Sequence, residues 1–307
     1  MSSAVALGAG LSVLQRGWLS SNNVLLDGPD GATLIDSGHC THAAQTVALV
    51  RQRIGEQPLL EVINTHLHSD HCGGNAALQS AWACRVRVPS GSWQAVRAWD
   101  EEALGYASMR QRIERFSAHE QMRPGQTLPV GKRQWQVLAA PGHDPQSVML
   151  FDAEHGVLIS ADALWENGFG LIFPELEGES AFDDAARVLD LIDTLPVRVV
   201  IPGHGAPFTD LSGALQRARS RLAGFRVDPV RHHQHAAKVL LKYHLMEEQQ
   251  QELAALRRWM QDTPLMQAIW SRLGQPLSHM DAWCEQLLQG MLASGLLSQR
   301  EGSVHDA

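Results

Sequence analysis

Four residues of one short segment have side chains that bind metal ions: His66, His68, Asp70 and His71, within THLHSDH. Imidazole and carboxylate are ligand types that suit zinc, iron or manganese. Histidines two residues apart in an extended segment can point the same way and share one ion, and the Asp-His pair after a turn can face a second ion. At this chain's histidine frequency, 15 in 307, such a spacing arises by chance in roughly 0.002 of chains. We therefore interpret the segment as a metal-binding motif and not as a histidine-rich surface loop.

Three residues farther along the chain have the same ligand types and a similar setting. His143 lies in PGHD, Asp162 ends the apolar run VLISAD, and His204 lies in PGHG. Each follows or ends a predicted strand, where loops present side chains from a rigid sheet. A single histidine after a strand is usually an ordinary surface residue, but together the three complete a coordination set.

Alternating strands and helices must position these ligands. Apolar runs bounded by turn residues predict strands at 11–18, 23–26, 32–35, 59–64, 85–88, 135–139, 148–151, 157–160 and 197–201. Helical spacing predicts helices at 41–54 and 182–195, and the segment 92–122 looks mostly helical. This alternation, with hairpins at the start, predicts sheets covered by helices on the outside.

The pattern changes near residue 215. From there, helical spacing predicts helices at 215–225, 233–246, 250–261 and 280–293, and LLSQREGSV predicts a closing strand-turn-strand. We therefore expect a catalytic domain at 1–214 and a second domain at 215–307. Helices followed by a small hairpin are typical of a winged-helix-like appendage.

Composition limits the classes of partner. The chain of 307 residues has a formal net charge of −8, so it lacks the basic footprint of a nucleic-acid binder, although a local basic patch can occur on an acidic protein. No run of eighteen apolar residues predicts a membrane span. The N-terminus lacks the positive region of a signal peptide, and the four cysteines have no CxxC spacing. We expect a cytoplasmic protein with a small-molecule substrate and reduced thiols.

In the type and order of its motifs, the chain resembles the metallo-β-lactamase-fold superfamily, over residues 10–210. The resemblance implies a mixed α/β (α+β) fold, a four-layer αββα sandwich with the site at one edge between the sheets. It also implies these roles: His66, His68 and His143 hold a first ion, Asp70, His71 and His204 hold a second, Asp162 bridges them, and Asp36 in LIDSG supports the site from beneath.

Such a site has a defined chemistry. Two divalent ions, zinc first with iron or manganese as alternatives, would lower the pKa of a bridging water to ~7. One ion would also polarise the substrate's carbonyl or phosphoryl oxygen. Asp70 is the expected catalytic residue, because it can orient the hydroxide and later help to protonate the leaving group.

The aspartate at 162 favours some branches of the superfamily over others. True metallo-β-lactamases lack it, whereas glyoxalase II-like thioesterases, lactonases and phosphodiesterases have it. The segment PGHDPQS departs from the PGHTxGH pattern of glyoxalase II, and Trp165 stands where acyl-homoserine lactonases have a tyrosine hydroxyl. The tail fits the winged-helix-tailed hydrolases best, and some of these cleave RNA.

Other residues have less specific interpretations. Trp165, Asn167 and Phe169 directly follow the bridging aspartate and are expected to line the substrate pocket. The aromatic residues within 92–122 form either a lid or ordinary packing. The run RHHQH at 231–235 is interpreted as a solvated helix end, and Cys72 as a buried neutral thiol.

These observations favour a binuclear metal-dependent hydrolase of a thioester, lactone or related acyl compound. One alternative is a phosphodiesterase or ribonuclease on the same metal site. Another is a regulatory or binding protein that keeps the metals. The mixed charge of the tail favours a structural or dimerisation role, so a homodimer is a candidate assembly.

Overall fold

The computed structural model describes residues 5, 7–273 and 279–307. They form two compact units. The first contains the described residues up to 107 together with 111–174 and 181–221, and the second contains 108–110, 175–180 and the described residues from 222 onward. This division falls inside helix α8 (Leu211–Val227). The domain boundary at residue 215 remains a prediction.

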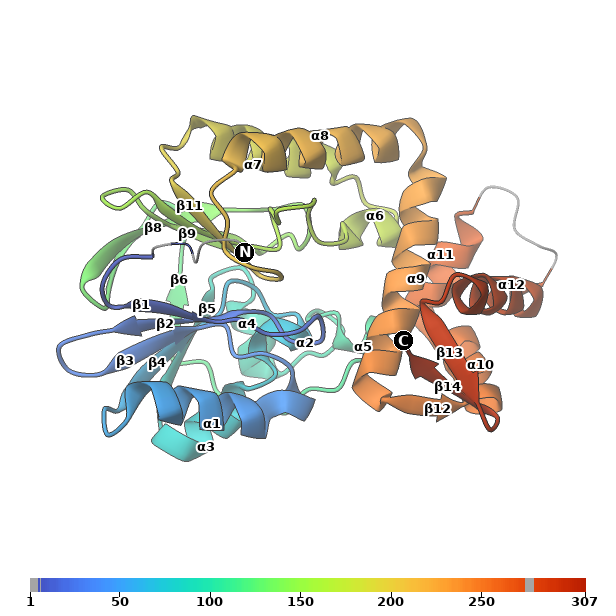
Figure 1. Cartoon of the computed structure of the whole chain (residues 1–307), viewed down its shortest axis with the longest axis horizontal. Helices are drawn as coiled ribbons and strands as arrows, with labels where there is room; N and C mark the ends of the chain where they lie inside the picture. The colour runs from blue at the N-terminus through green and yellow to red at the C-terminus, as the bar shows by residue number, and fades with distance from the viewer. Residues whose placement is uncertain (1–4, 6, 274–278) are drawn as a thin grey trace. The chain divides into compact units, whose positions relative to one another are not determined.

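Two sheets form the centre of the first unit (Figure 1). The six-stranded sheet consists, in spatial order, of β1 (Leu11–Leu14), β2 (Asn23–Asp27), β3 (Ala32–Ile35), β4 (Leu59–Ile63), β5 (Arg85–Pro89) and β6 (Glu120–Met122). The five-stranded sheet consists of β11 (Val199–Pro202), β10 (Val157–Ala161), β9 (Val148–Asp152), β8 (Arg133–Ala139) and β7 (Thr127–Val130). Consecutive strands from β1 through β3, and from β7 through β10, pair antiparallel. The remaining neighbouring strands pair parallel.

Helices cover the outer faces of both sheets (Figure 1). Helices α1 (Ala43–Ile54) and α3 (Asn75–Trp82) lie on the first sheet, and α7 (Phe182–Thr194) and α8 lie on the second. Arg219 of α8 bonds Asp190 and Asp193 of α7 at 2.8 and 3.0 Å. The predicted mixed α/β sandwich is confirmed.

Alternating side chains of the central strands build two apolar layers. Leu25 and Leu34 pack toward α1 and α3, while the neighbouring Leu26 and Ile35 pack toward the second sheet and Trp135. Successive strand residues point to opposite faces, so a strand covered on both sides needs a continuous apolar run. The runs NVLLD and ATLI supply it.

Two predictions in this unit were wrong. The strand expected at 11–18 ends at Leu14, because the backbone N–H of Arg16 bonds the Asn22 side chain at 3.0 Å instead of a neighbouring strand. The segment 92–122 contains only the short helices α4 (Trp93–Ala98) and α5 (Tyr106–Met109), followed by β6. Trp99, Gly105 and Arg110 have φ values of 55°, 77° and 53°, which no right-handed helix accommodates.

The second unit is mainly helical, as predicted. It contains α9 (Pro229–Glu248), α10 (Leu253–Asp262), α11 (Pro264–Ser271), α12 (Met280–Ala293) and a sheet of the order β12 (Gln250–Glu252), β14 (Ser303–Asp306), β13 (Leu297–Arg300). The closing hairpin is confirmed. Helix α11 was not predicted. The helix predicted from 250 begins at Leu253, because Gln250–Glu252 pair with β14.

The histidine run at the start of α9 is not a solvated helix end. His232 and His233 are buried, and His232 packs on Phe225 with ring centroids 4.9 Å apart. Nδ1 of His233 lies 2.8 Å from the carbonyl oxygen of Pro229. The run therefore belongs to the packing of this unit. None of the described helices is long and apolar enough to cross a membrane.

Candidate metal centre

Loops that follow strands bring the predicted ligands together at one edge of the sandwich. Asp36 follows β3, the THLHSDH motif follows β4, and the remaining ligands follow β8, β10 and β11. The motif turns into the single-turn helix α2 (Ser69–Cys72), which holds Asp70 and His71. Thr65 ties the motif to both sheets, since its N–H donates to Asp36 at 2.8 Å and its carbonyl accepts from Val148 at 2.9 Å.

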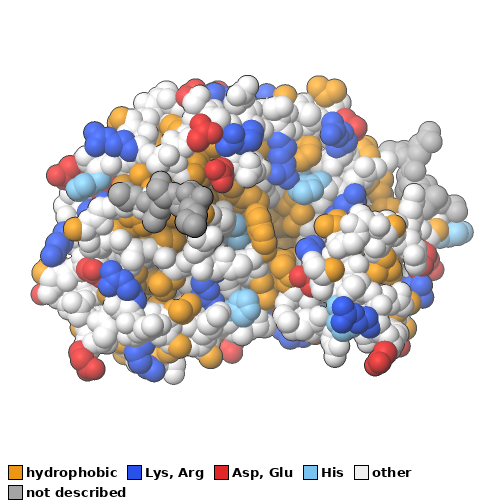
Figure 2. All heavy atoms as spheres, in the orientation of Figure 1, with side chains coloured by type: hydrophobic (Ala, Val, Ile, Leu, Met, Phe, Trp, Pro, Cys, Tyr) orange, Lys and Arg blue, Asp and Glu red, His pale blue; other side chains and the backbone are white. Residues whose placement is uncertain are grey.

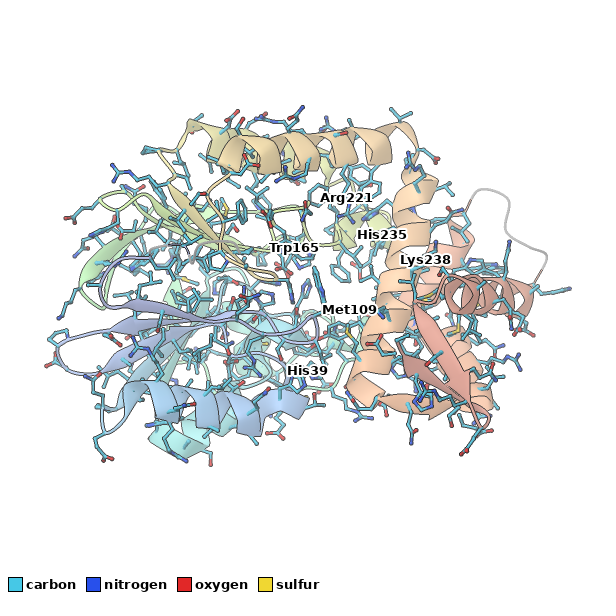
Figure 3. The ribbon with its side chains drawn as sticks, in the orientation of Figure 1. His39, Met109, Trp165, Arg221, His235 and Lys238 are labelled. Carbon is cyan, nitrogen blue, oxygen red and sulfur yellow. The ribbon has the colours of Figure 1, made fainter. Side chains whose placement is uncertain are left out.

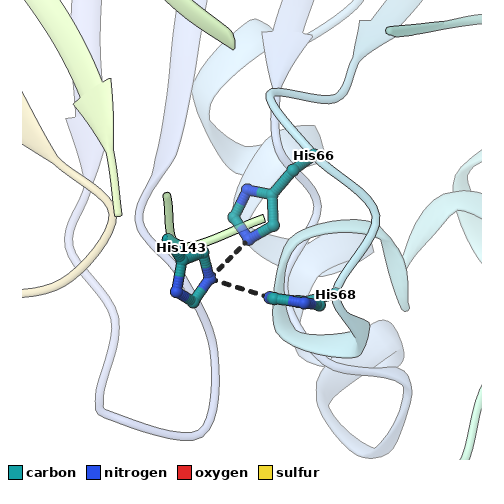
Figure 4. Close-up of side chains that lie close together, drawn as sticks. All are labelled: His66, His68 and His143. Carbon is teal, nitrogen blue, oxygen red and sulfur yellow. Dashed lines mark hydrogen bonds between the residues drawn. The ribbon is translucent and has the colours of Figure 1, made fainter. Parts of the chain in front are cut away.

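The side chains form two clusters able to bind metal ions, and each cluster's ligand atoms lie within 4.8 Å of one another. The first consists of His66, His68 and His143, and the second of Asp70, His71, Asp162 and His204. In Figure 4 the imidazoles of the first cluster converge: Nε2 of His143 lies 2.8 Å from Nδ1 of His68 and 3.2 Å from Nε2 of His66. All seven residues are buried.

Asp162 lies between the two clusters. Its Oδ2 is 3.4 Å from Nε2 of His71 in the second cluster and 3.4 Å from Nε2 of His143 in the first. Nε2 of His71 is buried without a hydrogen-bond partner among the described residues. A buried polar atom without a partner is costly, and a cation between these atoms would satisfy it. The residues present therefore fit the metals that the resemblance implies.

The first cluster is electrically suited to bind cations. Burial and, to a smaller extent, neighbouring histidines lower the pKa of His66, His68 and His143, to about 4 for the last two. A neutral imidazole has a lone pair for a metal ion. All three ligands are therefore ready to bind a metal at neutral pH.

The second cluster is charged instead. Burial lowers the pKa of His71, but Asp162, Asp36 and Asp70 outweigh burial and hold it well above the usual value. Burial raises the pKa of Asp162, but His71 and His204 outweigh it and hold that pKa well below the usual value. Without metal, the cluster thus contains an imidazolium beside carboxylates.

His71 is fixed by buried polar groups on two sides. Nδ1 lies 2.7 Å from Oδ2 of Asp36, which leaves Nε2 facing the cluster. Its carbonyl accepts from the N–H of Ser37 at 2.7 Å and from Nδ2 of Asn64 at 3.1 Å, and Asn75 in turn donates to Asn64 at 2.7 Å. Asp36 was predicted from the resemblance. The other three were missed, and their only sequence signal is a polar residue beside an apolar run.

A tyrosine and a cysteine hold the loop that carries the first cluster. The Tyr106 hydroxyl donates to the carbonyl of Leu67 at 2.7 Å, and the Cys72 thiol lies 3.3 Å from the same oxygen. Burial raises the pKa of Cys72, so it is the buried neutral thiol that was expected. Tyr106 thus packs in the core of this unit, as one of the two expectations had it, and its hydroxyl also holds the loop.

Two glycines allow the close approach at Asp162. A Cβ at Gly203 would lie 2.1 Å from Oδ1 of Asp162, and one at Gly170 would lie 2.5 Å from Nδ1 of His143. Both contacts are shorter than any that real Cβ atoms make. The indole N–H of Trp165 donates to the same Oδ1 at 3.2 Å. These neighbours orient the carboxylate.

The three residues expected to line the pocket differ in position. Trp165 packs edge-on against His204 with ring centroids 5.3 Å apart. Phe169 lines a pocket with His143 and Asp162, and the guanidinium of Arg221 lies over its ring; Trp165 and Arg221 are labelled in Figure 3. Asn167 is exposed at the tip of a turn, and the structure does not bring it to the ligands.

Comparison with known proteins identifies the family. The model of the metallo-beta-lactamase superfamily matches residues 16–204, which include every ligand of both clusters. The match covers more than half of the chain. The chain belongs to the metallo-beta-lactamase superfamily.

The individual relatives share less than 30% sequence identity with this chain. The chain is 29% identical to acyl-coenzyme A thioesterase MBLAC2 of Gallus gallus, over 49% of this chain and 57% of the relative. It is 24% identical to hydroxyacylglutathione hydrolase of Bdellovibrio bacteriovorus, over 48% of this chain and 50% of the relative. The matches thus span about half the length of these two relatives. A metallo-beta-lactamase family protein of Thermus thermophilus shares the fold, with a TM-score of 0.60 at 20% identity over 98% of this chain and 100% of that chain.

Proposed function

We propose that this protein is a metal-dependent thioester hydrolase. The observation that carries the proposal is the pair of buried ligand clusters with Asp162 between them. His66, His68 and His143 would hold one divalent ion, Asp70, His71 and His204 the other, and Asp162 would bridge them. Zinc is the first expectation, and iron and manganese bind the same ligand types. When bound, two such ions supply a hydroxide at neutral pH and polarise the substrate carbonyl.

The protein's own residues handle the protons and orient the site. Burial raises the pKa of Asp70, but His71 and His204 outweigh burial and lower that pKa to about 2. Asp70 is therefore a carboxylate at neutral pH and can accept a hydrogen bond from the attacking water, which orients that water. Its Oδ2 lies 3.0 Å from Nε2 of His204. Cys72 is excluded as the nucleophile, because its buried thiol faces backbone carbonyls.

The choice of a thioester rests on the relatives. Acyl-coenzyme A thioesterase MBLAC2 and hydroxyacylglutathione hydrolase are both named as enzymes that hydrolyse thioesters. Asp162 fits this choice, although it is also typical of lactonases and phosphodiesterases. We also propose that the protein works in the cytoplasm, since all four cysteines are thiols. The winged-helix-like tail would have a structural or dimerisation role.

A phosphodiesterase acting on RNA is the second candidate, because the helical tail with its closing hairpin is typical of that branch too. Charge opposes it. The net charge is −8, and on the face drawn in Figure 2 Lys and Arg side chains are dispersed among Asp and Glu. Nucleic-acid binding needs basic groups that neutralise phosphates. A binding protein without turnover is the third candidate.

A substrate panel tests the proposal. The zinc-loaded protein should hydrolyse acyl thioesters faster than lactones, and should leave bis-p-nitrophenyl phosphate and RNA uncleaved. His68→Ala should abolish the thioesterase activity, while the matched control His279→Ala, an exposed histidine outside both clusters, should keep it. Cleavage of the phosphodiesters alone would support the second candidate, and no turnover at all would support the third.

A further inference from the structure

We propose that Trp18 is a specificity-determining residue whose indole binds an apolar, planar group attached to the reacting carbonyl. This inference rests on the proposed hydrolase function. Trp18 has 59% of its surface exposed, the largest exposed fraction of any tryptophan among the described large hydrophobic residues. A single exposed apolar side chain is common on protein surfaces, but this indole also stacks on His204, a residue of the second cluster.

The turn that carries Trp18 is tied to the ligand loops. The N–H of Ser21 donates to the carbonyl of Asp70 at 3.0 Å, and the N–H of Asn22 donates to the carbonyl of Gly203 at 2.6 Å. The Asn22 side chain also donates to the carbonyl of Gly205, at 2.7 Å. The position of Trp18 is thus fixed relative to the second cluster.

Three rings form an aromatic corner: Trp18, Trp165 and His204. The Trp18 ring is parallel to that of His204, with an interplanar angle of 10° and centroids 5.4 Å apart. The Trp165 ring meets it edge-on, with centroids also 5.4 Å apart. Fully overlapping rings would have centroids about 3.5–4 Å apart. The indole of Trp18 is therefore displaced and extends beyond the imidazole that it covers.

The corner is suited to an apolar group. The cation nearest to Trp18 in the sequence, Arg16, donates to Asn23 and Thr46 at 2.7 and 2.8 Å, so its charge is directed to those side chains. Aromatic rings stack favourably in offset or edge-on arrangements, which the exposed part of the indole offers to a planar ligand. Trp165, itself part of the corner, contacts both Trp18 and Asp162. A group on a carbonyl that reacts beside Asp162 thus has the indole within reach.

The apolar group has two sources, because a thioester carbonyl has an acyl side and a thiol side. Two substrate pairs separate them: acetyl against benzoyl thioesters of N-acetylcysteamine, and acetyl thioesters of N-acetylcysteamine against those of thiophenol. Each substrate is compared between variant and wild type, so intrinsic reactivity cancels. The variants are Trp18→Ala and Trp18→Phe, and Leu60→Ala, another exposed apolar residue, is the matched control.

We expect Trp18→Ala to raise KM at least tenfold for the aromatic member of one pair. The kcat for that substrate, and both kcat and KM for the acetyl thioester of N-acetylcysteamine, should change less than twofold. Trp18→Phe should restore KM to within threefold, and the metal content should stay that of wild type. If kcat/KM falls equally for every substrate, or if the variant binds less metal, Trp18 only positions His204 and the proposal is overturned. Unchanged KM for both aromatic substrates would overturn it too.

A binding measurement keeps this inference separate from the hydrolase function. Calorimetry with uncleavable thioether analogues, phenacyl against acetonyl on the acyl side and S-phenyl against S-alkyl on the thiol side, needs no turnover. If wild type hydrolyses no thioester yet binds one aromatic analogue at least tenfold more tightly than Trp18→Ala does, the hydrolase proposal fails and the aromatic corner stands. Equal binding by both proteins would contradict the corner itself.

Discussion

His71, one of the proposed ligands, is held by buried polar groups on several sides. Its ring bonds Asp36 on one side and faces Asp70 and Asp162 on the other, and its carbonyl is bonded by Ser37. Neutral histidines form the first cluster, while this one is held protonated. The two metal positions should therefore differ in how their affinity depends on pH.

The first prediction concerns that difference. In the metal-free protein the pKa of His71 is raised well above its usual value, so at pH 7 it carries a proton that a metal ion must displace. Binding at the second cluster should release about one proton, and its affinity should rise with pH until the pKa is reached. Calorimetric titration with zinc in buffers of different ionisation enthalpy measures the release. Heat that is independent of the buffer would contradict the assigned charge.

Removing the Asp36 carboxylate should weaken the second metal position. Asp36→Asn keeps a side chain that tolerates the observed φ of 58°, but it no longer holds the imidazolium. We expect the zinc affinity to fall about 10–100-fold with the fold retained. Competition with a chromophoric chelator measures the affinity, and Asp30→Asn in an exposed turn is the control. Unchanged affinity would show that Asp36 has no supporting role.

The sequence predicted the ligands better than their surroundings. The spacing of THLHSDH and the strand-ending positions of His143, Asp162 and His204 are local patterns, and all seven residues lie in the two clusters. Tyr106 and Trp18 lie far in sequence from the residues that they contact, Leu67 and His204. Local sequence patterns around them therefore do not predict these contacts.

At the scale of elements, the same distinction applies. Buried strands such as β3 and β10 have continuous apolar runs, so they were predicted within one residue. The segment 92–122 was not, because its path depends on left-handed residues that a periodicity argument ignores. Trp99, at φ 55°, is an example: tertiary packing on Tyr106 and Phe116 holds a conformation that its residue type disfavours.

Segment 92–122 contains Tyr106, whose hydroxyl bonds the loop that carries His66 and His68. Tyr106→Phe removes the donor to the buried Leu67 carbonyl and should lower the free energy of unfolding by about 1–2 kcal/mol, because the Cys72 thiol still faces that oxygen. Urea unfolding of the metal-free protein measures it. Trp82→Phe, in the same apolar layer but without a bond to the loop, is the comparison. A loss below about 0.3 kcal/mol, under the usual range, would mean that the bond does not stabilise the loop.

At the scale of the whole molecule, the chain combines a sandwich unit that contains both ligand clusters with a helical unit of which the family model matches only residues 108–110 and 175–180. The strand and helix patterns predicted the mixed α/β class, and the family resemblance predicted that the site lies at one edge of the sandwich. Neither the patterns nor the resemblance predicted the function of the second unit. Three of its histidines, His232, His233 and His244, are buried and belong to its own packing.

The central claim is a two-metal site, and counting metal ions in the purified protein tests it most directly. After loading with zinc and removal of excess ions, mass spectrometry under native conditions should find two equivalents in wild type. His68→Ala and His71→Ala should each retain about one, because each removes a ligand from a different cluster, and His279→Ala should retain two. A wild-type protein that binds fewer than one equivalent, or variants that still bind two, would contradict the account.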